Sequence, residues 1–185
     1  MMRGKQGILL FCSLLCLTGC GVKTKDPDCG TPLTSVIPAD YFEFIGSTAK
    51  EQAEDLKPYG SAKVLENGDL EITMTKDRQE QIIRLHQEEV DEIIDRFLAA
   101  DEDYTYLYVG VDNSYTFGYS PDIDPMLQAQ VLYMVPALHT FDTMLTTGNP
   151  FWQIHIKVVN CETGDTVAEA TLPEETLTFT AEDWQ

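Results

Sequence analysis

The chain has 185 residues, of which 12 are lysine or arginine and 31 are aspartate or glutamate, so its formal net charge is −19. This length suits one globular domain of ordinary size with a short extension. A surface this acidic repels nucleic-acid phosphates and anionic headgroups, which argues against nucleic acid as a partner. The charge is also uneven, because beyond Arg96 the only lysine or arginine is Lys157, against 14 acidic residues.

The first residues have the three zones of an export signal. Arg3 and Lys5 precede an almost wholly apolar run from Ile8 to Leu17. That run is too short to span a bilayer, which needs about 20 apolar residues, and is typical of a signal peptide. It ends in Leu17-Thr18-Gly19-Cys20, which resembles the lipobox of bacterial lipoproteins.

The lipobox resemblance implies a processing route and a location. In that family the cysteine thiol is diacylglycerylated and the peptide bond before it is cut, so residues 1–19 would be a signal peptide and Cys20 the lipidated N-terminus. Two or more acyl chains on one cysteine anchor a protein stably. We therefore expect a protein attached by its N-terminal lipid to the extracytoplasmic face of the cell membrane.

A tether is expected next, over residues 20–40, which are rich in proline, glycine and small polar residues. Processing would leave two cysteines besides Cys20. Outside the cytoplasm Cys29 and Cys161 could form a disulfide or stay unpaired, and their spacing decides neither. The chain has no CxxC motif and no Cys/His cluster, so the sequence predicts no metal and no cofactor.

Residues 41–185 are expected to form a single globular domain. Thr48 and Glu51 have the spacing of a capping box that opens a short helix. Turn residues and hydrophobic periodicity then predict hairpins alternating with long helices. The expected order is a hairpin over 63–75 turning at Asn67-Gly68, a helix to about 99, a hairpin over 104–120 turning at Asp112-Asn113, a helix over 125–147 broken or kinked at Pro136, and a hairpin over 151–172 turning at Thr163-Gly164.

This alternation predicts an α+β fold. Three hairpins would form one antiparallel or mixed sheet, and the two long helices would pack on one of its faces as a two-layer sandwich. The order of the strands does not follow from the pattern.

Three segments resemble a family. The run Asn67–Thr75, the acidic Asp101–Tyr104 and the turn Asn160–Thr166 are similar to a group of small uncharacterised lipoproteins from Gram-positive anaerobes. The likeness covers roughly residues 45–175. It implies the architecture and a place in the cell envelope, and no activity. The chain departs from the group in its tyrosine-rich hairpin and its two extra cysteines.

The tyrosine-rich hairpin is the candidate binding surface. Its first strand carries three tyrosines on one face and its second strand carries three aromatic residues on one face: Tyr104, Tyr106, Tyr108, Tyr115, Phe117 and Tyr119. Such platforms stack on sugars or dock a partner. The alternative is ordinary packing beneath the helices, because the opposite face of the first strand is apolar too.

Two histidines are candidates for chemistry. His86 precedes Glu89, and His139 precedes Asp142, each by three residues on an expected helix. A histidine and a carboxylate at that spacing could share a metal ion, but no second ligand pair accompanies either one. A histidine at the margin of the core is the favoured interpretation. Motifs of nucleotide-binding and hydrolytic enzymes are missing, so no catalytic residue is nominated.

Three functions remain open at this point. The first is a non-catalytic module that binds a surface protein or a glycan in the cell envelope. The second is an envelope hydrolase, for which His86 or His139 beside a carboxylate would be the place to look. The third is a carrier or inhibitor of a hydrophobic molecule, which would need a closed apolar cavity.

Overall fold

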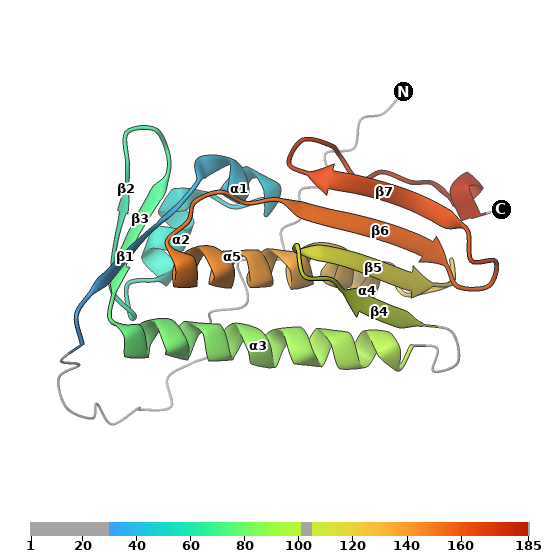
Figure 1. The fold of residues 1–185 in the computed structure, drawn as a ribbon, viewed down its shortest axis with the longest axis horizontal. Coiled ribbons are helices and arrows are strands. Elements are labelled where there is room, and N and C mark those ends of the chain that lie inside the picture. The colour runs from blue at the N-terminus through green and yellow to red at the C-terminus, as the bar shows by residue number, and fades with distance from the viewer. Residues whose placement is uncertain (1–29, 101–104, 185) are drawn as a thin grey trace. The chain divides into compact units, whose positions relative to one another are not determined.

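In the computed structural model, residues 30–100 and 105–184 are described (Figure 1). The signal peptide, Cys20, Cys29 and Tyr104 lie outside them. The described residues divide into two compact units: those up to Ile82, together with Leu145–Pro150, form unit 1, and those from Ile83 to Met144 and from Phe151 onward form unit 2. In the described part of the chain, no helix is long and apolar enough to cross a membrane.

Unit 1 contains an antiparallel sheet of three strands. Its strands are β1 (Leu33–Ile37), β2 (Ser61–Val64) and β3 (Leu70–Met74), in the order β1-β3-β2. The hairpin predicted at Asn67-Gly68 is confirmed as β2–β3, and Gly68 takes a φ of 90°, which glycine adopts without strain. Alternate residues of β3 are buried, as the sequence pattern predicts for a strand with one covered face.

Strand β1 corrects the expected tether. Residues 33–37 pair with β3 from Leu33 opposite Met74 to Ile37 opposite Leu70, and Ile37 is fully buried. The Ser35 hydroxyl donates to the carbonyl of Leu145 at 2.9 Å. A tether to residue 40 is therefore wrong, since the chain is already part of a sheet at residue 33. Residues 33–37 include the β-branched Thr34, Val36 and Ile37, which favour a strand. The flanking Pro32 and Pro38 instead suggested a tether.

Two short helices accompany this sheet, α1 (Ala39–Phe44) and α2 (Ala49–Asp55). The predicted capping box at the start of α2 is confirmed. Thr48 Oγ1 accepts from the Glu51 amide at 3.2 Å, and the Glu51 carboxylate accepts from the Thr48 amide at 3.0 Å. Helix α1 was not predicted.

Unit 2 contains a mixed sheet of four strands. They are β4 (Tyr106–Val109), β5 (Ser114–Tyr119), β6 (Ile154–Asn160) and β7 (Thr166–Leu172), in that spatial order. The outer pairs are the two predicted hairpins and are antiparallel, whereas the central pair β5–β6 is parallel. A parallel pair needs a long crossover, which here runs through the second helical segment.

The long helices agree closely with their predicted ranges. Helix α3 spans Lys76–Leu98. The second segment consists of α4 (Pro125–Ala129), a π-helical turn over Gln130–Met134 and α5 (Val135–Thr147). Pro136 cannot donate a backbone hydrogen bond and its ring crowds the preceding turn, and the wide π turn lies just before it. The helix thus continues past the proline instead of ending there.

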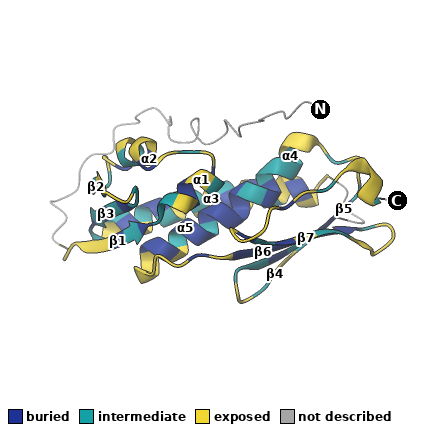
Figure 2. Cartoon of the chain, turned by 90° about the horizontal axis from the view of Figure 1, so that it is seen from above, coloured by how far each residue is buried: buried dark blue, intermediate teal, exposed yellow. Residues whose placement is uncertain are grey.

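Within unit 2 the helices lie on one face of the sheet (Figure 2). Phe97 of α3 meets Phe117 and Tyr119 of β5 edge-on, with ring centroids 6.2 and 5.9 Å apart. The α+β class is confirmed. The single sheet is wrong, because the three hairpins divide between two sheets.

Candidate functional site

The aromatic side chains of the tyrosine-rich hairpin divide between two faces. Leu107 lies opposite Phe117 and Val109 opposite Tyr115, whereas Tyr108 lies opposite Thr116. Opposite residues share a face, so the aromatic residues of β5 point to the helices and the tyrosines of β4 point away from them. Tyr115, Phe117 and Tyr119 are buried, so including these three in an exposed surface was wrong.

Tyr106 and Tyr108 remain as the exposed part of the predicted surface. A Cβ atom on Gly118, across the strand pair, would lie 2.0 Å from Cε1 of Tyr106. The missing side chain of Gly118 therefore gives the Tyr106 ring a flat seat on the sheet. The sequence analysis overlooked Gly118, although a glycine inside a strand pattern signals a close approach of this kind.

Exposed apolar side chains continue from these tyrosines into the following turn. We call Tyr106, Tyr108, Val109 and Val111 the β4 strip; their exposed fractions are 41%, 66%, 46% and 99%. Single exposed apolar residues are ordinary, but here Tyr106 and Tyr108 on the outer face and Val109 on the other face expose apolar surface on both sides of one edge strand, as interaction sites do.

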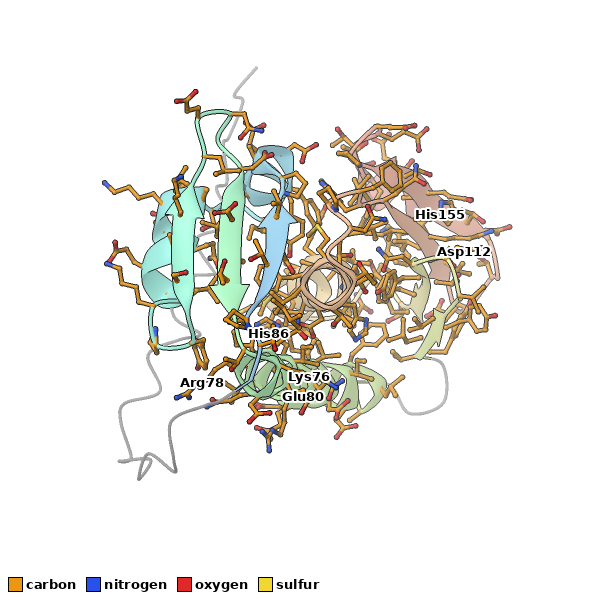
Figure 3. The ribbon with its side chains drawn as sticks, turned by 60° about the vertical axis from the view of Figure 1, so that its left-hand side comes forward. Lys76, Arg78, Glu80, His86, Asp112 and His155 are labelled. Atoms are coloured by element: carbon orange, nitrogen blue, oxygen red, sulfur yellow. The ribbon has the colours of Figure 1, made fainter. Side chains whose placement is uncertain are left out.

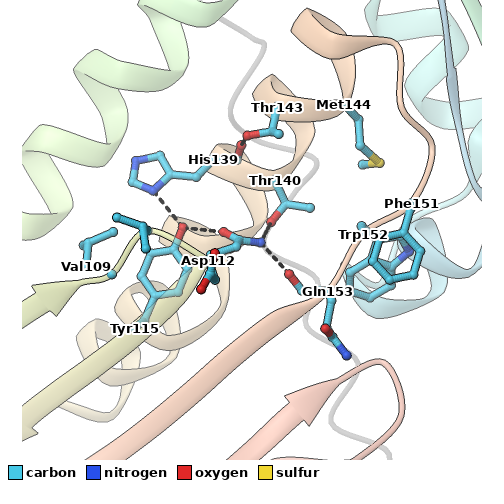
Figure 4. A pocket seen from close by; sticks show the side chains of 13 residues that line it. Val109, Asp112, Tyr115, His139, Thr140, Thr143, Met144, Phe151, Trp152 and Gln153 are labelled. Atoms are coloured by element: carbon cyan, nitrogen blue, oxygen red, sulfur yellow. Dashed lines mark hydrogen bonds between the residues drawn. The ribbon is translucent and has the colours of Figure 1, made fainter.

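A pocket of 390 Å³ lies beside the end of the β4 strip (Figure 4). Three segments line it: the β4–β5 turn from Val109 to Asn113, the residues of α5 from His139 to Met144 that face it, and Phe151–Gln153. Phe151 is a largely exposed aromatic residue, whereas Trp152 beside it is buried. The pocket therefore combines apolar side chains with a polar network.

Asn113 organises that polar network and takes a φ of 53°, a conformation that asparagine tolerates better than most residues. Its Nδ2 donates to the carbonyl of Gln153 at 2.6 Å and to Thr140 Oγ1 at 2.9 Å. Its Oδ1 accepts from the hydroxyl of Tyr115 at 2.9 Å. The side chain thus links the β4–β5 turn to α5 and to the segment before β6.

These bonds fix the tautomer of His139. Its Nδ1 lies 3.0 Å from the Tyr115 hydroxyl oxygen. Since that hydroxyl has one proton and gives it to Asn113, Nδ1 of His139 carries the proton and donates. Nε2 is then the hydrogen-bond acceptor of the neutral ring. Among the described residues no buried side-chain nitrogen lacks a partner, so Nε2 reaches solvent.

Burial keeps this network neutral. It lowers the pKa of His139, against the opposing influence of the Asp142 and Asp91 carboxylates. Burial also raises the pKa of Tyr115 far above its ordinary value. Both groups are therefore uncharged at neutral pH, and the floor of the pocket offers hydrogen bonds without a formal charge.

His86 has a partner that the sequence analysis did not assign to it. Its Nδ1 lies 2.6 Å from Oδ1 of Asp142, so the pair links α3 to α5. The sequence analysis had instead paired each histidine with a carboxylate on its own helix, His86 with Glu89 and His139 with Asp142. The ring of Phe141 packs edge-on against His86 at 5.6 Å. His86 and Asp142 are 56 positions apart in the chain, so no local sequence pattern indicates that they form a hydrogen bond.

The other histidine, His155, lies on the outer face of the unit 2 sheet (Figure 3). Its Nε2 is 3.1 Å from Oε1 of Glu169 on the neighbouring strand β7. Over residues 30–100 and 105–184, no three histidine, cysteine, aspartate or glutamate side chains gather as metal ligands would. Cys161 is half-buried in the turn after β6. Since Cys29 lies outside the described residues, both expectations stand, a Cys29–Cys161 disulfide and two unpaired thiols.

Comparison of the chain with protein-family models, with curated proteins and with solved structures gives no match in any of the three. The site is therefore interpreted from its own residues.

Proposed function

We propose that this protein is an extracytoplasmic lipoprotein, anchored through an acylated Cys20, that binds a surface protein or a glycan without catalysing a reaction. The observation that carries the proposal is the β4 strip, in which four large apolar side chains stay exposed on one edge strand and its turn. Water disfavours such a surface, so covering it with a partner releases free energy.

The chemistry of the strip supports a binding role. Tyrosine combines a rigid apolar ring with a polar tip and is enriched at interfaces. Because Tyr106 is seated on Gly118, its ring has little conformational freedom to lose when a partner covers it. Tyr108, which is more exposed, extends the same aromatic face.

The two other functions have weaker support. A hydrolase that used a protein nucleophile at His86 would need a hydroxyl or thiol group beside that ring, and among the described residues none hydrogen-bonds to it. A carrier for a hydrophobic molecule would need an apolar cavity, whereas the floor of the 390 Å³ pocket is the polar network of Asn113, Tyr115 and His139.

Photo-crosslinking in native cells tests the binding role. A benzophenone amino acid replaces Tyr108 in one strain and Met126, an equally exposed apolar residue of α4, in a control strain. We expect a discrete adduct from position 108 and none from position 126. The same adducts from both positions, or none from position 108, would contradict the proposal.

A further inference from the structure

We infer that the open edge of β4 receives an extended, basic peptide segment of a partner protein as an additional strand. This inference rests on the proposed binding role and names its partner and geometry. It follows from the main-chain geometry of β4, from the contrast with the opposite edge of the same sheet, and from the charge of the chain.

The main chain of β4 offers hydrogen bonds at its outer edge. The Gly110 amide donates to the carbonyl of Ser114 at 2.8 Å, and the register places these two residues opposite each other. In an antiparallel pair the hydrogen-bonded positions alternate, so Tyr108 and Tyr106 also bond to β5. The N–H and C=O groups of Leu107 and Val109 therefore point outward, away from β5.

The opposite edge of the sheet is protected. On β7, the Thr171 amide donates to Oε2 of Glu175 at 2.7 Å, and the Glu175 amide donates back to the Thr171 carbonyl at 2.8 Å. Glu169 adds a charge to the same strand. These are the usual devices that stop an edge from pairing. Residues 105–111 contain neither a charged residue nor a proline, so within this described segment only the short length of β4 acts against pairing.

Charge selects the occupant. Beyond Arg96 the chain has 14 acidic residues against Lys157, and Asp112 lies next to the β4 strip in the turn. A second copy of this chain would bring the same negative charge, which disfavours it as the partner. A basic segment with apolar residues at alternate positions matches both the charge and the exposed tyrosines, because strand addition takes affinity from the main chain and specificity from alternate side chains.

A single proline substitution, with an alanine control at the same position, tests the inference. The probe is a fluorescent peptide of alternating lysine and valine, titrated against the full-length chain and followed by anisotropy. Val109→Pro removes an outward N–H without removing a bond to β5, at the kind of edge position where sheets accept proline. Val109→Ala trims the same half-exposed side chain and keeps the N–H.

We expect Val109→Pro to weaken binding by about tenfold or more, and Val109→Ala by no more than about threefold, because one lost ladder bond also leaves a peptide carbonyl unpaired. A peptide of alternating glutamate and valine should not bind. If Val109→Pro does not fold by circular dichroism, a lysine–valine peptide N-methylated at alternate residues provides the same test on the wild-type chain, and it should bind about tenfold more weakly.

Three outcomes overturn strand addition: equal affinities of the Pro and Ala variants or of the methylated and unmethylated peptides, equal binding of the acidic peptide, or a β4-dependent dimer in ultracentrifugation, which would assign the edge to a second copy. If the peptide experiments fail while position 108 still gives its discrete crosslink in cells, strand addition is wrong and the binding role stands. Loss of that crosslink refutes the binding role itself.

Discussion

In the tyrosine-rich hairpin, aromatic side chains on adjacent strands have opposite environments: some are exposed to solvent and others are buried in the core. Tyr106 lies on the outer face, seated on Gly118, while Phe117 is fully buried beneath the helices. The cost of removing a ring depends on how much of it is shielded from water and on whether the space can be refilled. The two residues therefore make a matched pair of truncations.

Tyr106→Ala should lower the free energy of unfolding by only about 1–2 kcal/mol, since its ring is partly exposed and leaves no closed cavity. Phe117→Ala should cost about 3–5 kcal/mol, because it empties a buried aromatic site. Urea denaturation curves of the two variants measure the difference. Equal losses would show that Tyr106 belongs to the core and would remove it from the proposed binding surface.

The half-buried imidazole of His139 predicts a dependence of stability on pH. Because burial lowers the pKa of His139 below its ordinary value of 6.5, the unfolded chain takes up a proton there more readily than the folded chain. The contribution is fully present above pH 6.5 and is lost as the pH falls through the lowered pKa of the folded state. Asp142 and Asp91 reduce the size of the effect but do not reverse it.

Unfolding curves at about pH 7.5 and about pH 5 test this behaviour. Between the higher and the lower pH, the change in stability should be less favourable in the wild type than in His139→Gln, which keeps a donor near Tyr115 but does not titrate. His155→Gln removes a more exposed imidazole and serves as the control. A decline in His139→Gln as steep as in the wild type would show that other groups cause it.

Among the elements, β1 differs most from what the sequence predicted, because it is a paired strand where a tether was expected. Ile37 is fully buried opposite Leu70, whereas Leu33 at the other end of the strand is exposed. Ile37→Ala should therefore cost about 2–5 kcal/mol of stability, the usual range for truncating a buried aliphatic residue. Leu33→Ala, the control, should cost about 0.5 kcal/mol or less, as surface changes do. A negligible cost at both positions would restore the tether interpretation.

Local signals explain which elements could be predicted. Each of the three hairpins is indicated by the dipeptide at its turn: Asn67-Gly68, Asp112-Asn113 and Thr163-Gly164. The capping box is indicated by Thr48 and Glu51, and each of these signals extends over only a few residues of the chain. The pairs β1–β3 and β5–β6 join segments far apart in the chain, and nothing local encodes them. The division into two sheets follows from those distant pairs and was missed for that reason.

The same distinction holds for the candidate site. Alternation placed Tyr106 and Tyr108 on one face correctly, but both faces of that strand are apolar, so only the register with β5 decides which face meets the helices. The contacts of His86 with Asp142 and of Asn113 with Gln153 span 56 and 40 residues. Side chains brought together over such distances could not be grouped from the sequence alone.

At the scale of the whole molecule, the proposed anchor depends on one atom, the sulfur of Cys20. Cys20→Ala should leave the protein unacylated, and either uncleaved or released, because the processing route of the lipobox family acts on that thiol. Mass spectrometry of the N-terminal peptide from the membrane fraction measures this. An unmodified Cys20 in the wild-type protein would contradict the membrane location, and Gly19→Ala, another small residue before the cysteine, is the control that should still be acylated.

The two units are interleaved along the chain, which affects how they can be inherited. Leu145–Pro150 belong to unit 1, although in the sequence they lie between two parts of unit 2. The Leu145 carbonyl accepts hydrogen bonds from Ser35 and Gln79, both of unit 1. No single cut separates the units, since the fragment that begins at Ile83 still carries those six residues of unit 1. A crossover at that point would therefore transfer unit 2 together with six residues of unit 1 and leave unit 1 incomplete, so the two units are expected to be inherited together.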